Sequence, residues 1–291
     1  MKIKLISVII INKHDRDVDT TLRLLQNQEI DQSFEIIVVD ASKGALDDVY
    51  AQYSQVRCIP FTTTSTKHVT IPEQRNVGVA AAKGEIIVFI DASCEPGADW
   101  LQTLVGPILV DGEMITAGGT LSSDSKTFHD VVYHTQAHQK YLDQAPTINL
   151  AIARSVFDTI GYFDENLRYG SDMDLTWRAR AAGFNIRNVP DALVTHNWGN
   201  LKSELKRANH YGQAKVILYR KHRYGFLRLI RRESTLFIYI GFVLLLPLTF
   251  WIPFYPLLIL IPILKNLRAH SGNLILINLM TAYGAAKEFI S

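Results

Sequence analysis

The stretch GEIIVFIDASCEPG, residues 84–97, predicts a buried strand that ends in an acid. Its apolar residues 86–90 form a continuous run, which is typical of a strand covered on both faces of a sheet. Asp91 follows that run directly and lies in a tight turn before Pro96. A carboxylate in such a place can hold a divalent metal together with the phosphates of a nucleotide. The simpler alternative is that Asp91 only caps the turn.

Strands and helices alternate along the first 110 residues on either side of this stretch. Apolar runs predict further strands at residues 5–11, 34–39 and 56–60, and helical spacing predicts helices at residues 17–28, 46–53, 72–82 and 99–110. Such alternation with short links predicts an α/β domain with a mostly parallel sheet. Ligands bind such sheets at the carboxyl ends of the strands. Asp40 ends one of these strands as Asp91 ends another, which gives the first indication of a site.

The pattern loosens after residue 114. Gly118 and Gly119 predict a turn or hairpin, and residues 128–141 form either a helix or a mobile loop. Helices are predicted at residues 151–160 and 175–182, with short strands at residues 186–189 and 192–195.

The C-terminal third is basic and then apolar. Residues 202–233 contain ten Lys/Arg and two acids, a charge of +8 in a chain whose net charge is +2. Residues 236–264 carry no charge, exceed the roughly 20 residues that span a bilayer, and include Pro247, Pro253, Pro256 and Pro262. Because both flanks are positive and the prolines break a regular helix, we expect a re-entrant or interfacial helix–break–helix at a membrane. The alternative is a buried helical pair in a soluble domain or dimer.

Composition excludes several other classes of protein. The 291 residues are 48% hydrophobic, too apolar for a disordered chain, and a net charge of +2 gives no field for nucleic acid. Cys58 and Cys94 form no CxxC motif, so we expect two reduced thiols. The apolar run at residues 5–11 is too short for a signal peptide, which predicts that the catalytic part stays in the cytoplasm.

Three further groups of residues carry possible chemistry. Asp172 and Asp174 lie at the start of a predicted helix, where one is expected to cap it and the other can act as a general base. His196 follows an apolar run and is either a metal ligand or an ordinary loop histidine. Arg75 and Asn76 open another helix, and their donors suit a diphosphate and a base, unless they form only a solvated first turn.

Together these pieces resemble the family 2 glycosyltransferases, which have a GT-A fold, over roughly residues 5–200. The resemblance rests on these stretches in the expected order: SVIII (7–11), EIIVVDAS (35–42), RNVG with AKGE (75–78 and 82–85), FIDAS (89–93), NLA with GYFDE (149–151 and 161–165), GSDMDL (170–175) and VTH (194–196). The segments YGQA (211–214) and RKH (220–222) also resemble a branch that builds bacterial exopolysaccharides, including succinoglycan-type glucosyltransferases.

The resemblance implies a role for each matched residue. It places the nucleotide sugar against Asp40, Arg75, Asn76, Asp91 and Ser93, and it places Mg²⁺ or Mn²⁺ on Asp91 and His196. Asp172 aligns with the proposed base of an inverting transfer. Two positions depart from the pattern: Ser93 replaces the second acid of the DxD motif, and Ser171 replaces the glutamate of the ED pair. No QxxRW-like motif is present, which argues against a processive synthase.

The sequence therefore predicts three segments. Residues 1–200 form the GT-A catalytic domain, residues 201–235 a basic juxtamembrane helical segment, and residues 236–291 apolar helices associated with a membrane. The predicted enzyme moves a sugar, UDP-linked by default, to a lipid-linked saccharide at the cytoplasmic face of the inner membrane. The alternatives are a catalytically weakened membrane-bound scaffold, for which Ser93 and Ser171 are the evidence, and a nucleotidyltransferase. The latter usually has a glycine-rich phosphate loop, and residues 12–16 contain no glycine.

Overall fold

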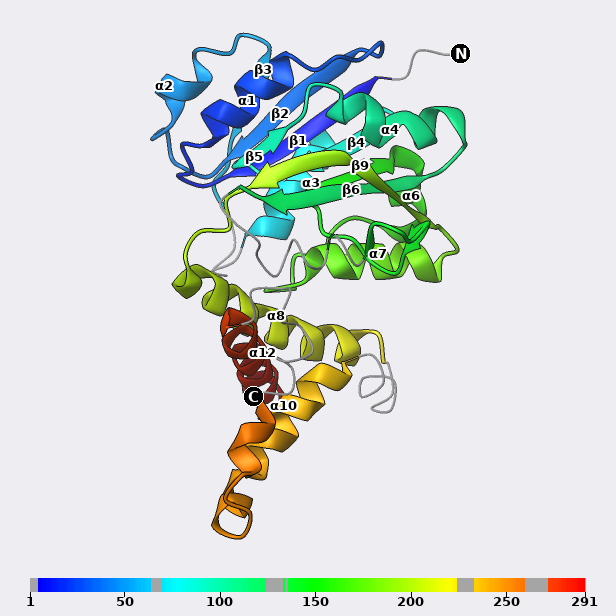
Figure 1. Ribbon diagram of the computed structural model, residues 1–291. Helices are drawn as coiled ribbons and strands as arrows, with labels where there is room; N and C mark the ends of the chain where they lie inside the picture. The colour runs from blue at the N-terminus through cyan, green and yellow to red at the C-terminus, as the bar shows by residue number, and fades with distance from the viewer. Residues whose placement is uncertain are drawn as a thin grey trace. The chain divides into compact units, whose positions relative to one another are not determined.

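The computed structural model describes residues 5–63, 70–123, 133, 136–223, 233–259 and 272–290. The predicted helix or loop at residues 128–141 falls mostly outside these ranges. The chain divides into two compact units (Figure 1). Unit 1 comprises residues 1–124, 132–166 and 171–197, and unit 2 comprises residues 125–131, 167–170 and 198–291. The predicted segments 201–235 and 236–291 thus lie in one unit.

Unit 1 is built on one mixed sheet, in which the described residues form nine strands in the order β3-β2-β1-β4-β8-β6-β9-β5, with β7 paired to β9. The strands are β1 (Ile6–Asn12), β2 (Phe34–Asp40), β3 (Val56–Pro60), β4 (Ile86–Ile90), β5 (Cys94–Pro96), β6 (Ile115–Ser122), β7 (Tyr141–Leu142), β8 (Asn149–Ala153) and β9 (Ile186–His196). The first four are parallel, so β1, β2 and β4 end at the same edge. Asn12, Asp40 and the turn at Asp91 are therefore brought together there.

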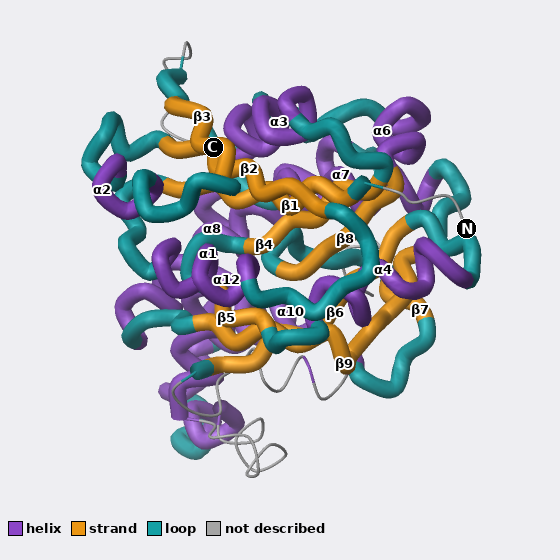
Figure 2. Tube along the Cα trace, turned by 90° about the horizontal axis from the view of Figure 1, so that it is seen from above, coloured by secondary structure: helices purple, strands orange, loops and turns teal. Residues whose placement is uncertain are grey.

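Helices cover both faces of this sheet (Figure 2). They are α1 (Val18–Gln26), α2 (Asp47–Tyr50), α3 (Ile71–Ala81), α4 (Trp100–Val110), α6 (Arg154–Ile160) and α7 (Ser171–Ala181). Gly78 of α3 lies so close to β1 that an added Cβ would meet the Ile9 side chain at 2.5 Å. Since β1 and β4 are buried on both faces, their residues are apolar without alternation, as predicted, apart from the buried Ser7 and Asn12 of β1.

The sheet differs from the predicted one beyond β4. It is mixed, because β8 runs antiparallel to both β4 and β6. Residues 151–153, predicted as helix, belong to the fully buried strand β8, and the helix begins only at Arg154. The glycines at 118 and 119 form no turn but lie within β6, where a Cβ at Gly118 would overlap the side chain of Asn149. Glycine is needed there for close approach, a reason that local sequence does not reveal.

Unit 2 is helical and contains α8 (Leu201–Lys221), α10 (Ser234–Leu244), the 3₁₀ helices η1 (Leu246–Phe250) and η2 (Tyr255–Ile259), and α12 (Gly272–Ile290). α8 and α12 cross at two glycines. A Cβ on Gly212 would overlap the carbonyl oxygen of Thr281, and one on Gly284 would overlap that of Asn209. The two backbones are therefore in direct contact, which only glycine permits.

Side chains hold the end of α12 as well. Arg220 of α8 donates to the carbonyl oxygens of Glu288 and Phe289 at 3.3 and 2.9 Å, and Arg168 pairs with the Glu288 carboxylate at 2.7 Å. Both cations lie at the C-terminus of the helix, where its dipole favours positive charge.

The apolar segment is broken, as predicted, into α10 and the two short 3₁₀ helices. Among the described helices, none combines the length and the apolar character that crossing a membrane requires.

The α8–α12 crossing gives a stability prediction. Gly212→Val places a branched side chain against the α12 backbone, so we expect a loss of about 3 kcal/mol, at the upper end of the cost of overpacking. Gly241→Ala is the matched control, because the α10 position has no atom within 4 Å of an added Cβ and alanine favours a helix by about 0.5–1 kcal/mol. Thermal unfolding measures both. Equal melting temperatures for Gly212→Val and the parent chain would contradict the crossing.

Candidate active site

Asp91 stands in a turn that a buried hydroxyl holds in place. The backbone N–H of Cys94 donates to the Asp91 carbonyl oxygen at 3.2 Å, which closes the turn. Thr21 of α1 is fully buried, and its hydroxyl lies 2.7 Å from the carbonyl oxygens of both Ala92 and Cys94. The turn is therefore fixed by α1 on one side and by the pairing of β5 with β9 on the other.

Four charged or titratable residues from four other segments act on the Asp91 carboxyl. Burial raises the pKa of Asp91, Arg75 and His196 lower it, and Asp172 and Asp15 raise it. Asp91 itself follows β4. The other four come, in the order just given, from α3, from the end of β9, from α7 and from the loop after β1. The structure thus brings together Arg75, Asp91, Asp172 and His196, all four of which were predicted as site residues.

Arg75 is a buried cation that forms no ion pair among the described residues, although it acts on Asp91. Its side chain is 9% exposed, and its guanidinium lies 5.5 Å from the centre of the Phe163 ring. Its nearest polar contact is the Ser171 hydroxyl at 3.4 Å, and within the described part of the chain it forms no ion pair with a carboxylate. Because a buried charge is costly when it is not compensated, this guanidinium is suited to an anionic ligand.

The two acids of α7 have different environments. The helix begins at Ser171, so both Asp172 and Asp174 lie in its first turn. One of them was expected to cap the helix, and neither is at the N-cap position. Asp174 is fully buried and pairs with Arg178 at 2.9 Å, and Arg178 in turn donates to the Tyr162 carbonyl at 2.7 Å. Asp172 is half-buried and accepts only the short-range bond from the Met173 N–H at 2.9 Å. Asp174 therefore has the structural role, and Asp172 is the acid that faces Asp91.

His196 is oriented by the turn after Asp91. Its Nδ1 lies 3.2 Å from the Ser93 carbonyl oxygen and 3.2 Å from the Ser93 hydroxyl. A proton on Nδ1 that is donated to the carbonyl places the ring lone pair on Nε2, the arrangement usual for a metal-binding histidine. The side chain of Ser93 thus contacts His196.

Asp91 and His196 fit a hard divalent cation only as a partial ligand set. Among the described residues, no three His, Cys, Asp or Glu side chains are grouped closely enough to hold a metal by themselves. Mg²⁺ and Mn²⁺ sites commonly have one or two protein carboxylates, with phosphate oxygens and water as the remaining ligands. The donor set therefore fits a cation that binds together with a phosphorylated ligand.

Asp40 is at the end of β2 as predicted, but its carboxylate is engaged inside the protein. One oxygen accepts from the Tyr50 hydroxyl at 2.9 Å, and the other accepts from the Ser42 hydroxyl and from the Ser42 N–H. Burial, together with Asp40, raises the pKa of Tyr50. The predicted contact between Asp40 and the base of a nucleotide stays a prediction.

Asn76 likewise has partners within unit 1. Its amide exchanges two hydrogen bonds with the backbone of Phe163, at 2.9 and 3.0 Å, and also donates to Glu165 at 2.8 Å. This places the Phe163 ring against Arg75. In this structure Asn76 positions its neighbour, and its predicted contact with the nucleotide is not tested.

Two residues with defined roles escaped the sequence analysis. Asp15 acts on Asp91 from the loop after β1, and the parallel ends of β1, β2 and β4 were the signal that could have located it. Asn149 was quoted only as part of the family stretch NLA, and it is buried. Its side-chain oxygen accepts from the Trp100 indole N–H at 2.9 Å, and its side-chain nitrogen donates to the Gly119 and Ala192 carbonyls at 2.8 Å. That bonding is visible only in three dimensions.

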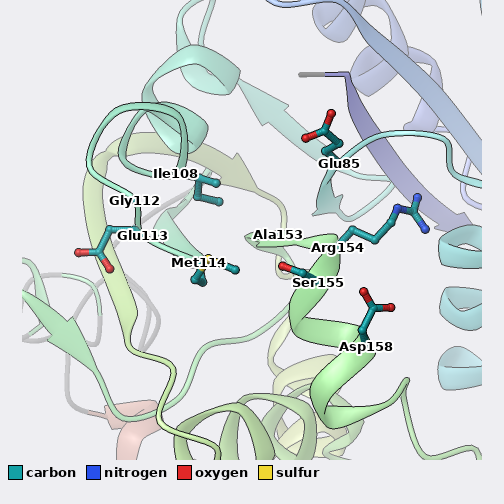
Figure 3. Close-up of a pocket in the computed structure, with 9 residues that line it drawn as sticks. All are labelled: Glu85, Ile108, Gly112, Glu113, Met114, Ala153, Arg154, Ser155 and Asp158. Carbon is teal, nitrogen blue, oxygen red and sulfur yellow. The ribbon is translucent and has the colours of Figure 1, made fainter. Parts of the chain in front are cut away.

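Two cavities in the described part of unit 1 bear on the location of the site. One, of about 350 Å³, is shown in Figure 3 and lies at the amino ends of β4 and β6, between Glu85, Glu113 and Asp158. Its Arg154 is bonded to the Ala82 and Gly84 carbonyls. The other, of about 260 Å³, borders Ser93 and is polar, with lining residues Asp17, Thr20, Ser93, Glu95, Ser123 and Asn197. We assign the reactive site to the carboxyl ends, because the charged residues around Asp91 lie there.

Comparison with known proteins agrees with this geometry. The family model for glycosyl transferase family 2 matches residues 7–169, more than half of the chain. The chain belongs to glycosyl transferase family 2. It is therefore a glycosyltransferase.

Named relatives of the family are distant. The glycosyltransferase AglE of Haloferax volcanii is 24% identical over 256 residues, which cover 81% of each chain. The pre-mycofactocin glycosyltransferase of Mycobacterium tuberculosis is 28% identical over 163 residues, which are 51% of this chain and 34% of that one.

Solved structures share the fold. The mannosyltransferase PcManGT of Pyrobaculum calidifontis, in complex with GDP-Man and Mn²⁺, matches 98% of this chain and 87% of its own, with a TM-score of 0.68 and 16% identity. GalNAc-T7 with UDP, GalNAc and Mn²⁺ matches 68% of this chain and 44% of its own, with a TM-score of 0.53 and 16% identity. At these identities the likeness establishes the GT-A-like α/β fold.

The division of roles within α7 predicts a difference in stability. Asp174→Asn removes one partner of a buried ion pair and leaves Arg178 uncompensated, so we expect a loss of about 3 kcal/mol. Asp172→Asn, two residues away on the same turn, removes only a carboxylate near a helix N-terminus and should cost less than about 1 kcal/mol. Chemical denaturation of both variants tests this, and the reverse order of stabilities would show that the two assignments are exchanged.

Proposed function

We propose that this glycosyltransferase moves a sugar from a nucleotide donor, UDP-linked by default, to a lipid-linked saccharide, with inversion at the anomeric carbon. The reaction belongs to the synthesis of a cell-surface polysaccharide or exopolysaccharide, at the cytoplasmic face of the inner membrane. The observation that carries the proposal is the buried guanidinium of Arg75, which lies near the acid Asp91 but forms no ion pair among the described residues.

The donor end of the reaction rests on Arg75 and Asp91. A nucleotide diphosphate supplies the negative charge that Arg75 lacks within the described residues, and a guanidinium suits phosphate geometry. The structures of PcManGT and GalNAc-T7 contain GDP-Man or UDP together with Mn²⁺, which supports a nucleotide donor and a divalent metal here. Asp91 and His196 would hold Mg²⁺ or Mn²⁺, and the bound cation supplies stabilisation of the charge on the leaving diphosphate.

The acceptor end rests on Asp172. It is the half-buried acid on α7, and Asp174 is already committed to Arg178. Asp172 accepts the proton of the acceptor hydroxyl while that oxygen bonds to the anomeric carbon, and the bond to the diphosphate breaks on the opposite face. A single displacement of this kind inverts the configuration.

A membrane location follows from the basic and apolar C-terminal third. The ten cations of residues 202–233 suit the anionic surface of a cytoplasmic leaflet, and a lipid-linked acceptor would lie in that same surface.

Calorimetric titration of UDP, GDP and dTDP, each with Mn²⁺, Mg²⁺ or EDTA, tests the proposed donor site. One nucleotide should bind with a metal, and Asp91→Asn or EDTA should weaken that binding by at least about tenfold, the equivalent of 1.4 kcal/mol. Asp158→Asn is the matched control, since it removes an acid from the cavity at the other end of the strands and should change nothing. A folded protein that binds no nucleotide would favour the scaffold alternative.

Turnover of Asp172→Asn tests the base. The variant should bind the donor nucleotide as the parent does and lose about 10²–10⁴-fold in kcat, the usual contribution of a general base. Sugar transfer is followed as release of the nucleoside diphosphate, and nuclear magnetic resonance of the product gives the anomeric configuration. Normal kcat in this variant, or a retained configuration in the parent, would overturn the mechanism.

A further inference from the structure

The far end of unit 2 is a hairpin made almost entirely of exposed apolar side chains. It is formed by the end of α10, by η1 and by η2, and in Figure 1 this orange part extends away from α8 and α12. Its most exposed residues are aromatic: Phe250, Trp251 and Phe254 are 92%, 86% and 75% exposed. Residues 234–259 contain no Asp, Glu, Lys or Arg. An aromatic patch of this kind marks a binding surface.

The base of the hairpin, by contrast, is packed. Leu236 and Tyr239 of α10 are buried in a cluster with Val216 of α8 and with Ala282 and Ala285 of α12. The first half of α10 therefore anchors the hairpin to the rest of unit 2. Ile238 within that half is also exposed, and from Val243 onward most side chains are exposed through η1 and η2.

The exposed part is apolar on every side and not on one face. Ile238, Val243 and Leu244 are 64%, 47% and 72% exposed. At about 100° per residue these three side chains leave α10 in directions about 100–140° apart. A partner protein or a second copy would cover one face and leave the others in water. A helix that is apolar all round needs an apolar environment all round, either a protein core or lipid.

Two polar side chains of the hairpin are hydrogen-bonded within it. The Tyr255 hydroxyl donates to the Phe242 carbonyl at 3.0 Å, and the Tyr255 ring stacks on the Phe242 ring. The Thr249 hydroxyl donates to the Leu246 carbonyl at 2.6 Å. Inside a bilayer an uncompensated polar group costs several kcal/mol, so such groups bond within the segment.

Length limits how deep the hairpin can reach. The eight residues 243–250, at a rise of about 1.5–2 Å per residue, span at most about 16 Å, and the hydrocarbon core of a bilayer is about 30 Å thick. The structure therefore suits a segment that enters one leaflet and turns near the midplane. The turn lies where Pro247 and Pro253 prevent a continuous helix.

We propose that residues 243–258 insert as a hairpin into one leaflet of a lipid bilayer, with Phe250, Trp251 and Phe254 at its deepest point. The proposal deepens the membrane location given above and rests on it, but it does not depend on the donor or on the chemistry at Asp172. A variant that loses lipid binding and keeps nucleotide binding therefore separates the two.

The first test is flotation of the full chain with neutral phosphatidylcholine vesicles, in which the basic residues gain nothing from lipid charge. The triple variant Phe250→Ser, Trp251→Ser, Phe254→Ser should lose vesicle binding on the order of a thousandfold, from the burial of three aromatic side chains. Val110→Ser is the matched control, because Val110 is 74% exposed on α4 of unit 1 and should not matter. Both variants should bind the donor nucleotide as the parent does. Unchanged flotation of the triple variant would overturn the proposal.

The second test measures depth. Tryptophan fluorescence is quenched in vesicles whose lipids carry bromine either near the headgroup or near the chain ends, and Trp251→Phe identifies the signal of Trp251. Bromine near the chain ends should quench Trp251 more strongly. Stronger quenching by bromine near the headgroup would mean that the hairpin lies flat at the surface. No quenching, with a dimer that the triple variant converts to a monomer, would mean that a second copy covers the hairpin. Either result would overturn one-leaflet insertion.

Discussion

One electrostatic group organises the site, the Asp91 carboxyl with the Arg75 guanidinium near it. Burial raises the pKa of this carboxyl, and the nearby cations Arg75 and His196 oppose that effect. Everything around the pair serves to hold it: Thr21 fixes the turn after Asp91, Asn76 places Phe163 against Arg75, and the Ser93 carbonyl orients His196. Arg75 forms no ion pair with a carboxylate among the described residues, so a ligand anion can offset the cost of burying this guanidinium.

The parallel half of the sheet makes this arrangement possible. Strands β1, β2 and β4 end at one edge, so the loops that follow them meet, although they are separated by tens of residues in the chain. β9 enters from the other half and delivers His196 beside Ser93 by pairing with β5. The departures from the family pattern take on a physical meaning here. Ser93 contacts His196, and Ser171 leaves Arg75 with a hydroxyl where the family pattern has a carboxylate.

The sequence predicted those features that depend on neighbours along the chain. Apolar runs ending in Asp40 and Asp91 located two strand ends, and the spacing of glycines and prolines located α3 and the broken apolar segment. Features that depend on distant partners were not predicted. The strand β8 was taken for helix because its buried run continues directly into α6, and the roles of Asp15 and Asn149 became visible only from their contacts. The structural role of Asp174 likewise became visible only from its ion pair with Arg178, four residues further on, which Asp172 does not share.

The central claim is that the nucleotide diphosphate binds beside Asp91 and Arg75. A crystal structure of the full chain with a nucleoside diphosphate and Mn²⁺ tests it most directly, because anomalous scattering locates Mn²⁺ independently of the ligands proposed for it. The account predicts the metal next to Asp91, with the diphosphate between it and the Arg75 guanidinium. Density for the nucleotide in the cavity between Glu85, Glu113 and Asp158, with the surroundings of Asp91 unchanged, would contradict it.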